Sequence, residues 1–233
     1  MTQNIHRAGA TNMSYIIAIS GGSGSGKSTL AAGLVKALVP RTVSLFVEDA
    51  YYWPRSHYPA DVPVSAINYD DPSSKDIGSL VRDLATLKSG KSIFQPRYDF
   101  ETHARAEGSD ELAPADIIIF EGIHTLSLPE ADHLIDLRVF VDTPDDLRLA
   151  RRIRRDVLER ERSVESVLSQ YMSTVRPAHY AHTYPAKFKA DLVIADEGLP
   201  AYGDLAPTDR AVARMIAPVV DRLAMLGVVE RQA

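Results

Sequence analysis

A glycine- and serine-rich stretch near the start of the chain has the residue types and the spacing to bind phosphate groups. Gly21, Gly26, Lys27 and Ser28 satisfy the pattern Gly-x-x-x-x-Gly-Lys-Ser/Thr. Glycines let main-chain N–H groups approach phosphate oxygens closely, a lysine can reach the β- and γ-phosphates, and a serine hydroxyl can hold Mg²⁺. The residues predicted to contact a nucleoside triphosphate are Gly21, Gly22, Ser23, Gly24, Ser25, Gly26, Lys27, Ser28 and Thr29.

The segments on either side of this stretch predict the elements that would position it. Residues 15–19 form a short apolar run typical of a buried parallel strand. After the loop, Leu30, Leu34 and Leu38 recur at helical spacing until Pro40 ends the predicted helix. This order, a strand followed by a glycine loop and then the first turn of a helix, directs several N–H groups at one point. The positive end of the helix dipole faces the same point. We therefore predict a nucleoside triphosphate site there.

Acidic residues stand at the ends of two further predicted strands. Glu48 and Asp49 follow the strand predicted over 42–47, and Glu121 follows the strand predicted over 116–120. The carboxyl ends of parallel strands face the crevice in which open α/β sheets bind ligands. Glu121 has the position of a Walker B acid, with a solvated glutamate that ends a buried strand as the alternative. Glu48 would point away from Asp49 if the pleat of its strand continued.

A basic segment follows the strand predicted over 137–142. Thr143 and Pro144 are predicted to open a helix, with Thr143 as its cap. One interpretation is a solvated face with ion pairs such as Arg152 with Asp156. The other is a lid that stabilises charge on a transferring phosphoryl group. The arginines concerned are Arg148, Arg151, Arg152, Arg154, Arg155, Arg160 and Arg162.

The remaining pattern alternates helices with strands. Helices are predicted over 74–88, over 164–175 up to Arg176-Pro177, and in a final segment capped by Thr208 or Asp209. A last strand is predicted over 189–194. This alternation predicts an α/β fold of the phosphate-loop NTPase type, with a mainly parallel sheet flanked by helices on both faces.

We expect one kinase-type domain rather than two, because nothing in the chain has the composition of a linker. The stretch from Tyr51 to Pro72 is too aromatic for a flexible linker and too interrupted by proline for a strand or long helix, so we interpret it as an ordered insert. The segment 101–114 is predicted to be a loop or a hairpin. The expected divisions are a loose leader over 1–13, the domain over 14–233, a substrate-side insert over about 50–75 and 92–114, and a lid over about 151–163.

Composition excludes several classes of protein. The net charge of −5 argues against a nucleic acid or an anionic membrane held by bulk charge. The chain has no cysteine, which excludes disulfides and thiolate metal sites. No apolar run approaches the roughly 18 residues that a membrane-spanning helix needs. We therefore expect a soluble cytoplasmic protein with a small-molecule substrate and no nucleic-acid or membrane partner.

Several short segments, in order along most of the chain from Tyr15 to Ile194, resemble those of the uridine kinase (uridine–cytidine kinase) family, within the phosphoribulokinase/uridine kinase group. The resemblance implies transfer of the γ-phosphoryl group of ATP to the 5′-hydroxyl of uridine or cytidine, in pyrimidine salvage, with ATP and Mg²⁺ as cofactors. It also implies a homotetramer. The segments that carry it are 21–29, 48–52, 68–72, 96–100, 120–123, 151–162 and 168–171.

The resemblance also implies roles for particular residues. Asp49 falls where the family has the aspartate that accepts the hydroxyl proton, and a carboxylate at a strand end can do so. Asp70 falls on the position that binds the ribose hydroxyls. The remaining implied roles are Mg²⁺ binding by Ser28, Glu121 and Asp49, charge stabilisation by Lys27, Arg152 and Arg155, ATP binding by Arg160, and substrate contacts by Tyr98, Phe100, His103, Arg152 and Gln170.

The chain departs from the family pattern at a few positions. Glu161 stands between Arg160 and Arg162, where the family usually has glycine, and Val47-Glu48 replaces Ser-Gln. Glu101-Thr102 separates Phe100 from His103. For His124, next to the Walker B segment, a structural role is favoured over substrate contact. Two other functions stay open, a kinase for another small alcohol such as a sugar phosphate or pantothenate, and a regulatory module that binds nucleotide.

Overall fold

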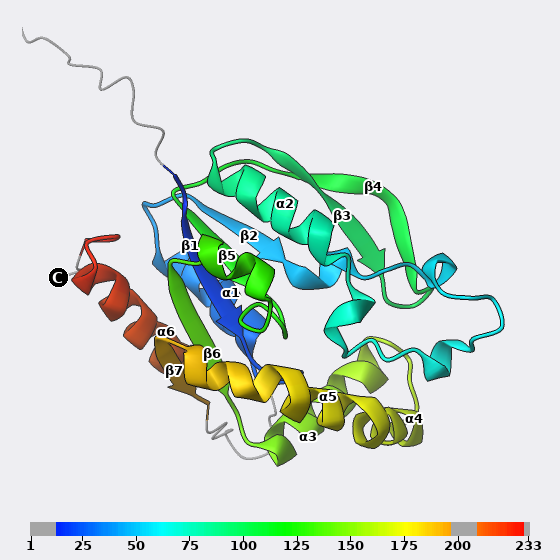
Figure 1. Ribbon diagram of the computed structural model, residues 1–233. Helices are drawn as coiled ribbons and strands as arrows, with labels where there is room; N and C mark the ends of the chain where they lie inside the picture. Colours follow the sequence, from blue (N-terminus) through cyan, green and yellow to red (C-terminus); the bar gives the residue numbers. More distant parts are fainter. Residues whose placement is uncertain (1–12, 197–208, 231–233) are drawn as a thin grey trace, which may run out of the picture.

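The computed structural model describes residues 13–196 and 209–230, and its centre is a parallel sheet with helices on both faces (Figure 1). The order of the five strands is β2-β5-β1-β6-β7, and every neighbouring pair is parallel. This arrangement confirms the predicted fold class. The strands are β1 (Tyr15–Ser20), β2 (Val43–Val47), β5 (Ile117–Glu121), β6 (Leu137–Asp142) and β7 (Leu192–Ala195).

The register of the central strands brings the predicted chemical groups to one edge of the sheet. Ile19 pairs with Glu121 across β1 and β5, and Val47 pairs with Glu121 across β2 and β5. The phosphate-loop stretch begins directly after Ser20, and Glu48 begins directly after Val47. The loops that leave three neighbouring strands therefore meet at the same place, as the carboxyl ends of parallel strands do.

Two helices cover one face of the sheet. α1 (Lys27–Ala37) and α6 (Asp209–Met225) pack on that face, and α6 contains Pro218. α1 ends three residues before the predicted stop at Pro40. The proposed cap Thr208 lies outside the described residues, as do residues 1–12 of the expected leader. The buried side chains of this layer include Ile17, Ile19, Leu30, Leu34, Met215, Val219 and Leu223.

The other face is covered by α2 (Ile77–Lys88) and by the 3-10 helix Pro129–Leu134. α2 begins at Ile77 rather than at residue 74, because the Asp76 carboxylate accepts a hydrogen bond from Ser79 N and caps the helix there. Its apolar stripe packs on side chains that alternate along β1 with those of the first face. The buried residues here include Ile16, Ala18, Phe46, Leu80, Leu84, Leu87 and Phe120.

The segments between β2 and β5 extend beyond the sheet (Figure 1). From Glu48 to Ser74 the chain makes a series of short 3-10 turns, as expected for a stretch that is neither a strand nor a long helix. β3 (Ile93–Asp99) and β4 (Ala104–Leu112) then form an antiparallel hairpin, which confirms one of the two alternatives for segment 101–114.

α3 (Asp145–Leu158) carries most of the arginines and starts differently from the prediction. Thr143 is not its cap, since the Thr143 hydroxyl donates to the Ser25 carbonyl at 2.9 Å and so ties the end of β6 to the phosphate loop. The residue before the helix is Pro144, without a side-chain cap. The helix ends at Leu158, so Arg160 and Arg162 lie in the following loop.

The prediction that a helix ends before Arg176-Pro177 is wrong. α4 (Val164–Gln170) continues through π-helical turns into α5 (Arg176–Ala178) and on to Lys189. Pro177 has no N–H to donate. The wider π turn, in which Arg176 N–H donates to the Tyr171 carbonyl, accommodates it. The last strand, β7, correspondingly starts later than predicted. Within the described residues, no helix is both long enough and apolar enough to cross a membrane.

Candidate active site

The phosphate loop lies between β1 and α1 and needs glycine at two of its turns. Gly24 and Gly26 have φ values of 78° and 88°, in the left-handed region that favours glycine. A Cβ at Gly24 would also overlap the Arg148 carbonyl. Ser25 N donates to the Gly22 carbonyl at 3.0 Å, which closes the turn directly before α1. The loop therefore has the strand, the glycines and the helix start that an anion site requires.

Lys27 and Ser28, at the start of α1, lie beside the acid at the end of β5. The Ser28 hydroxyl donates to Glu121 Oε1 at 2.7 Å, and the Lys27 side chain is largely buried. Burial raises the pKa of Glu121, and the charge of Lys27 opposes that rise. The buried Glu121 Oε2 has no hydrogen-bond partner among the described residues.

This pair fits a magnesium ion. A serine hydroxyl and an unpartnered carboxylate oxygen are the hard oxygen donors that Mg²⁺ prefers. The described residues form no cluster of three or more His, Cys, Asp or Glu side chains that could hold a metal. Mg²⁺ in proteins commonly takes one or two protein ligands and completes its shell with phosphate and water, which agrees with this sparse set.

Asp49 lies in the 3-10 turn Glu48–Tyr51 that follows β2, close to a buried lysine. Lys75 Nζ is 3.0 Å from Asp49 Oδ1 and 2.6 Å from Glu48 Oε1. Burial opposes ionisation of Asp49, but the charges of Lys75 and Lys27 outweigh it and lower the pKa of Asp49 to about 2. Asp49 is therefore a carboxylate at neutral pH. The condition under which Glu48 would point away from Asp49 is not met, because the strand pleat ends at Val47. Both carboxylates reach the same ammonium group.

The arginines of α3 and the following loop gather around one buried carboxylate, that of Asp156. Arg155 Nε donates to Asp156 Oδ1 at 2.9 Å, and Arg152 Nε lies 3.5 Å from Oδ2, which confirms the predicted Arg152–Asp156 ion pair. Arg160 Nη1 and Arg162 Nη1 approach the same carboxylate at 3.6 and 3.7 Å. The Asp156 carboxylate is thus surrounded by four guanidinium groups. Their excess positive charge is suited to binding a polyphosphate.

Arg152 connects this arginine group to the phosphate loop. Its Nη1 donates to Ser23 Oγ at 2.8 Å and its Nη2 donates to Gln170 Oε1 at 3.0 Å. The side chain of Arg152 is buried, so the interpretation as a solvated face does not apply to it. Arg160 instead lies over the ring of Phe100, with its guanidinium 4.5 Å from the ring centre.

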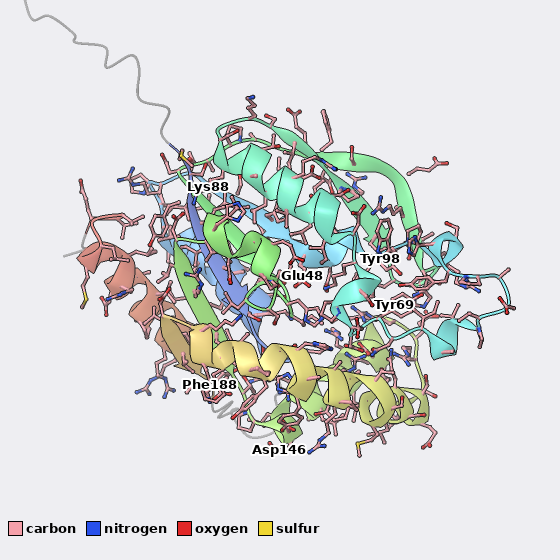
Figure 2. The ribbon with its side chains drawn as sticks, in the orientation of Figure 1. Glu48, Tyr69, Lys88, Tyr98, Asp146 and Phe188 are labelled. Atoms are coloured by element: carbon pink, nitrogen blue, oxygen red, sulfur yellow. The ribbon has the colours of Figure 1, made fainter. Side chains whose placement is uncertain are left out.

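Aromatic rings line the side of the site that faces the hairpin. Tyr69 stacks on His103, with ring centres 4.9 Å apart and planes 18° from parallel. Tyr98, which Figure 2 labels close to Tyr69, has its hydroxyl 3.5 Å from His103 Nδ1 and its ring 5.1 Å from that of Tyr52. Burial, helped by the charge of Arg162, lowers the pKa of His103, which keeps the imidazole neutral at pH 7.

The side chains of a second histidine, His124, and of Thr174 hold Asp70 beside these rings. His124 Nε2 donates to the Asp70 carbonyl at 2.9 Å, and Thr174 Oγ1 lies 3.5 Å from Asp70 Oδ2. Burial raises the pKa of Asp70, and the charge of Arg152 opposes that rise. The His124 side chain is fully buried, which agrees with the structural role favoured for it.

A cavity of about 1050 Å³ joins the phosphate loop, Asp49 and Asp70, the arginines and the aromatic rings. Sequence reasoning did not assign Tyr52, Tyr69 or Thr174 to the site, although all three line this cavity. The predicted site residues that line it are Ser23, Lys27, Asp49, Asp70, Tyr98, Phe100, His103, Arg152, Arg155, Arg160 and Gln170.

Comparison with known proteins agrees with this geometry. The model of the phosphoribulokinase / uridine kinase family matches residues 16–199, and the chain belongs to that family. A uridine kinase of Alkaliphilus metalliredigens is 41% identical over 187 residues, which cover 80% of this chain and 89% of that protein. A uridine kinase of Ligilactobacillus salivarius is 39% identical over 191 residues, covering 82% and 89%.

Solved structures show the same fold at lower identity. A putative fructose transport system kinase from Silicibacter has a TM-score of 0.65 at 22% identity, covering 77% of this chain and 89% of that one. A possible uridine kinase from Bacillus stearothermophilus has a TM-score of 0.57 at 23% identity, covering 81% and 90%. The phosphate-loop kinase architecture predicted from the sequence is thereby confirmed.

Proposed function

We propose that this protein is an ATP-dependent kinase that phosphorylates the 5′-hydroxyl of a pyrimidine ribonucleoside, uridine or cytidine. The observation that carries the proposal is the single cavity that contains Lys27 and Ser23 of the phosphate loop, the Asp49 carboxylate and an aromatic recess beside Asp70. The relatives named uridine kinase, about 40% identical over most of the chain, support it.

In this proposal the phosphate loop and the arginines bind the triphosphate. Main-chain N–H groups of residues 21–28 surround the β-phosphate, while Lys27, Arg152 and Arg155 stabilise the charge that develops on the γ-phosphoryl group. Mg²⁺, held by Ser28 and Glu121, with Asp49 as a further predicted ligand, would neutralise charge on the phosphate oxygens when bound.

Asp49 receives the proton of the attacking hydroxyl. The 5′-oxygen forms a bond to the γ-phosphorus, the bond from that phosphorus to the β,γ-bridging oxygen breaks, and ADP leaves. The hydroxyl proton passes to the Asp49 carboxylate, which is ionised at neutral pH. The protein supplies position and charge, since phosphoryl transfer needs little other help.

The recess opposite the phosphate loop would hold the nucleoside. The Asp70 carboxylate suits the ribose hydroxyls, and the rings of Tyr98 and Phe100 suit the face of a pyrimidine. Neutral His103 has one ring nitrogen that donates and one that accepts, so it can pair with the exocyclic oxygen of uridine or the amino group of cytidine. Gln170, fixed by Arg152, completes the substrate side.

We also propose a pathway, a compartment and an oligomeric state for the enzyme. We place the enzyme in pyrimidine salvage in the cytoplasm, acting on a small-molecule substrate. The family resemblance adds a homotetramer. The substrate-side insert and the lid expected from the sequence pattern are part of the same proposal.

A phosphorylation screen tests the proposal directly. Purified protein with Mg²⁺ and either ATP or GTP would be offered uridine, cytidine, purine nucleosides, pantothenate and sugar phosphates, with ADP or GDP formation and product mass as readouts. We expect rapid, ATP-dependent formation of a pyrimidine nucleoside monophosphate. Preferential turnover of pantothenate or a sugar phosphate would replace this function with that of another alcohol kinase. Slow ATP hydrolysis without any acceptor would favour a regulatory module.

A further inference from the structure

A buried lysine that the mechanism above does not use lies directly behind Asp49. The Lys75 side chain has no exposed surface, whereas that of Asp49 is 36% exposed and borders the cavity. The Lys75 ammonium group touches Asp49 Oδ1, Glu48 Oε1 and the ring of Tyr52, whose centre is 4.5 Å away. A lysine is seldom fully buried unless it is paired, and here one cation serves two carboxylates.

Glu48 fixes the position of that lysine. Its Oε1 accepts from Lys75 Nζ at 2.6 Å, and its Oε2 accepts from His124 N at 2.8 Å. The side chain is fully buried and lies against Gly122, where any Cβ would overlap it. Figure 2 places Glu48 in the interior of the molecule. Both oxygens of Glu48 are thus occupied, and it cannot turn toward the cavity.

The main chain on either side of Lys75 is tied to the turn that carries Asp49. Asp76 N donates to the Tyr51 carbonyl at 2.8 Å, and Trp53 N donates to the Ser74 carbonyl at 2.9 Å. Lys75 itself forms an isolated antiparallel bridge with Tyr52. The ammonium group and the Asp49 carboxylate therefore start from backbones that are held together on both sides.

We propose that Lys75 is a positioning residue for Asp49, and this inference rests on the proposed function. Lys75 holds Asp49 Oδ1, which fixes the carboxylate in one orientation. Oδ2 makes no hydrogen bond within the part of the chain that the structure describes, so it is left to receive the proton of the acceptor hydroxyl. A half-exposed aspartate in a short turn would otherwise rotate among several orientations, and small displacements of a reacting group strongly reduce rate.

The test separates positioning from simple stabilisation. Lys75→Met alone leaves Glu48 buried without its partner and destabilises the fold, so the informative variant is the neutral pair Glu48→Gln with Lys75→Met. It would be measured with the alcohol that the wild-type protein phosphorylates in the screen. We expect a folded protein whose KM values for ATP and acceptor stay within about threefold, and whose kcat falls about 10- to 100-fold.

A second comparison tests whether the loss of kcat in the neutral-pair variant acts through Asp49. In the Asp49→Asn background, adding the same neutral pair should lower kcat by less than about twofold, because residues that act as one unit are not additive. Lys88→Met is the matched control. Lys88 is also a buried lysine paired with an aspartate, Asp136 at 2.8 Å, but it lies at the opposite end of α2 from Lys75. It should lower Tm without lowering kcat.

A crystal structure of the ligand-free neutral-pair variant gives a readout that does not depend on any substrate. We expect the Asp49 side chain to occupy more than one orientation there, and a single one in the wild type. Three results would each overturn the inference. The neutral-pair variant could keep the wild-type kcat, or adding the pair in the Asp49→Asn background could lower kcat as much as in the wild type. The third result is a single, unchanged orientation of Asp49 in the variant crystal. Failure of the wild type to phosphorylate a pyrimidine nucleoside would instead overturn the proposed function, and the crystallographic comparison would still decide the role of Lys75.

Discussion

At the scale of single residues, the charge on Asp49 depends on lysines from two different elements. Lys75 precedes α2 and Lys27 opens α1, and together they overcome the effect of burial on the Asp49 carboxyl. A pKa of about 2 means that Asp49 is ionised at every pH at which the enzyme would be assayed. The residue is therefore a proton acceptor that needs no activation, which suits a reaction limited by position and charge.

Replacement of Asp49 by asparagine tests that role. The amide keeps the shape of the side chain and loses the ability to accept a proton. We expect kcat to fall by about 10²- to 10⁴-fold. Calorimetric titration should show little change in the affinity for ATP. Turnover close to that of the wild type would remove Asp49 from the reaction.

His103 is the residue that we expect to read the base. Its left-handed backbone, with φ of 53°, and its stack on Tyr69 fix the ring in one direction. His103→Leu should change the ratio of kcat/KM for uridine to that for cytidine by about 2- to 13-fold, since one hydrogen bond contributes roughly 0.5–1.5 kcal/mol. His103→Asn is the matched control, because asparagine tolerates this backbone and keeps a donor and an acceptor.

An unchanged ratio in His103→Leu would mean that the base is read elsewhere. The ratio is the informative quantity because a loss of folded protein lowers both rates equally and leaves it unaltered.

The site residues that could be predicted from the sequence are those that belong to a recognisable local pattern. Asp49 and Glu121 follow apolar strands, and the aromatic group of Tyr98 and Phe100 stands in a recognisable segment. Lys75 was missed because it is a single lysine, 26 residues from Asp49, in no pattern of its own. The adjacent acids Glu48 and Asp49 were the available signal, since a buried carboxylate needs a cation and residues 42–54 contain no lysine or arginine.

At the scale of elements, α3 and the loop after it are organised by Asp156. Its carboxylate is the common partner of Arg152, Arg155, Arg160 and Arg162, all of which line the cavity. Arginines this close repel one another, so the carboxylate is what lets them converge before a triphosphate arrives.

Asp156→Asn should therefore disturb both ATP binding and stability. Loss of one member of a buried charged network destabilises a fold by about 3–5 kcal/mol. We expect a raised KM for ATP and a lower Tm, measured by steady-state kinetics and thermal unfolding. Asp132→Asn is the matched control, as it removes a half-exposed aspartate paired with Arg138 outside the cavity. Equal effects of the two substitutions would contradict the assigned role of Asp156.

The element boundaries show where local pattern stops being informative. The density of arginine in α3 was evident, but not that Thr143 bonds the phosphate loop instead of capping the helix. Pro177 indicated a helix end, yet neighbouring π turns carry the chain past it. Glu161 adopts φ of 52°, the left-handed backbone that glycine adopts most readily. At Thr143 a tertiary contact decides the local structure, and at Pro177 the neighbouring turns do.

At the scale of the whole molecule, the two sides of the cavity are joined through buried polar groups. Lys75 donates to both Asp49 and Glu48. Glu48 also accepts from His124 N, and His124 donates to the Asp70 carbonyl, so the aspartates predicted for catalysis and for ribose binding belong to one network. Burial, followed by the charge of Lys75, lowers the pKa of His124 to about 3. The folded protein therefore holds this histidine neutral.

That neutral histidine makes stability depend on pH. Between about pH 6.5 and 3 the unfolded chain binds a proton at His124 that the folded chain does not, so stability falls as the pH falls through this range. His124→Gln keeps a donor for Asp70 and removes the titration. We expect its free energy of unfolding, from urea titrations at several pH values, to decline less steeply, by up to about 1.4 kcal/mol per pH unit. Parallel curves for the two proteins would contradict the account.

The central claim is that the cavity presents a nucleoside hydroxyl to Asp49 and to the end of a triphosphate at the same time. A crystal structure with uridine and a non-hydrolysable ATP analogue measures this directly. We predict the 5′-oxygen within about 3 Å of Asp49 and in line with the γ-phosphorus, with the pyrimidine beside Tyr98 and His103. A γ-phosphate turned away from Asp49, with no pyrimidine nucleoside in the recess, would contradict the claim.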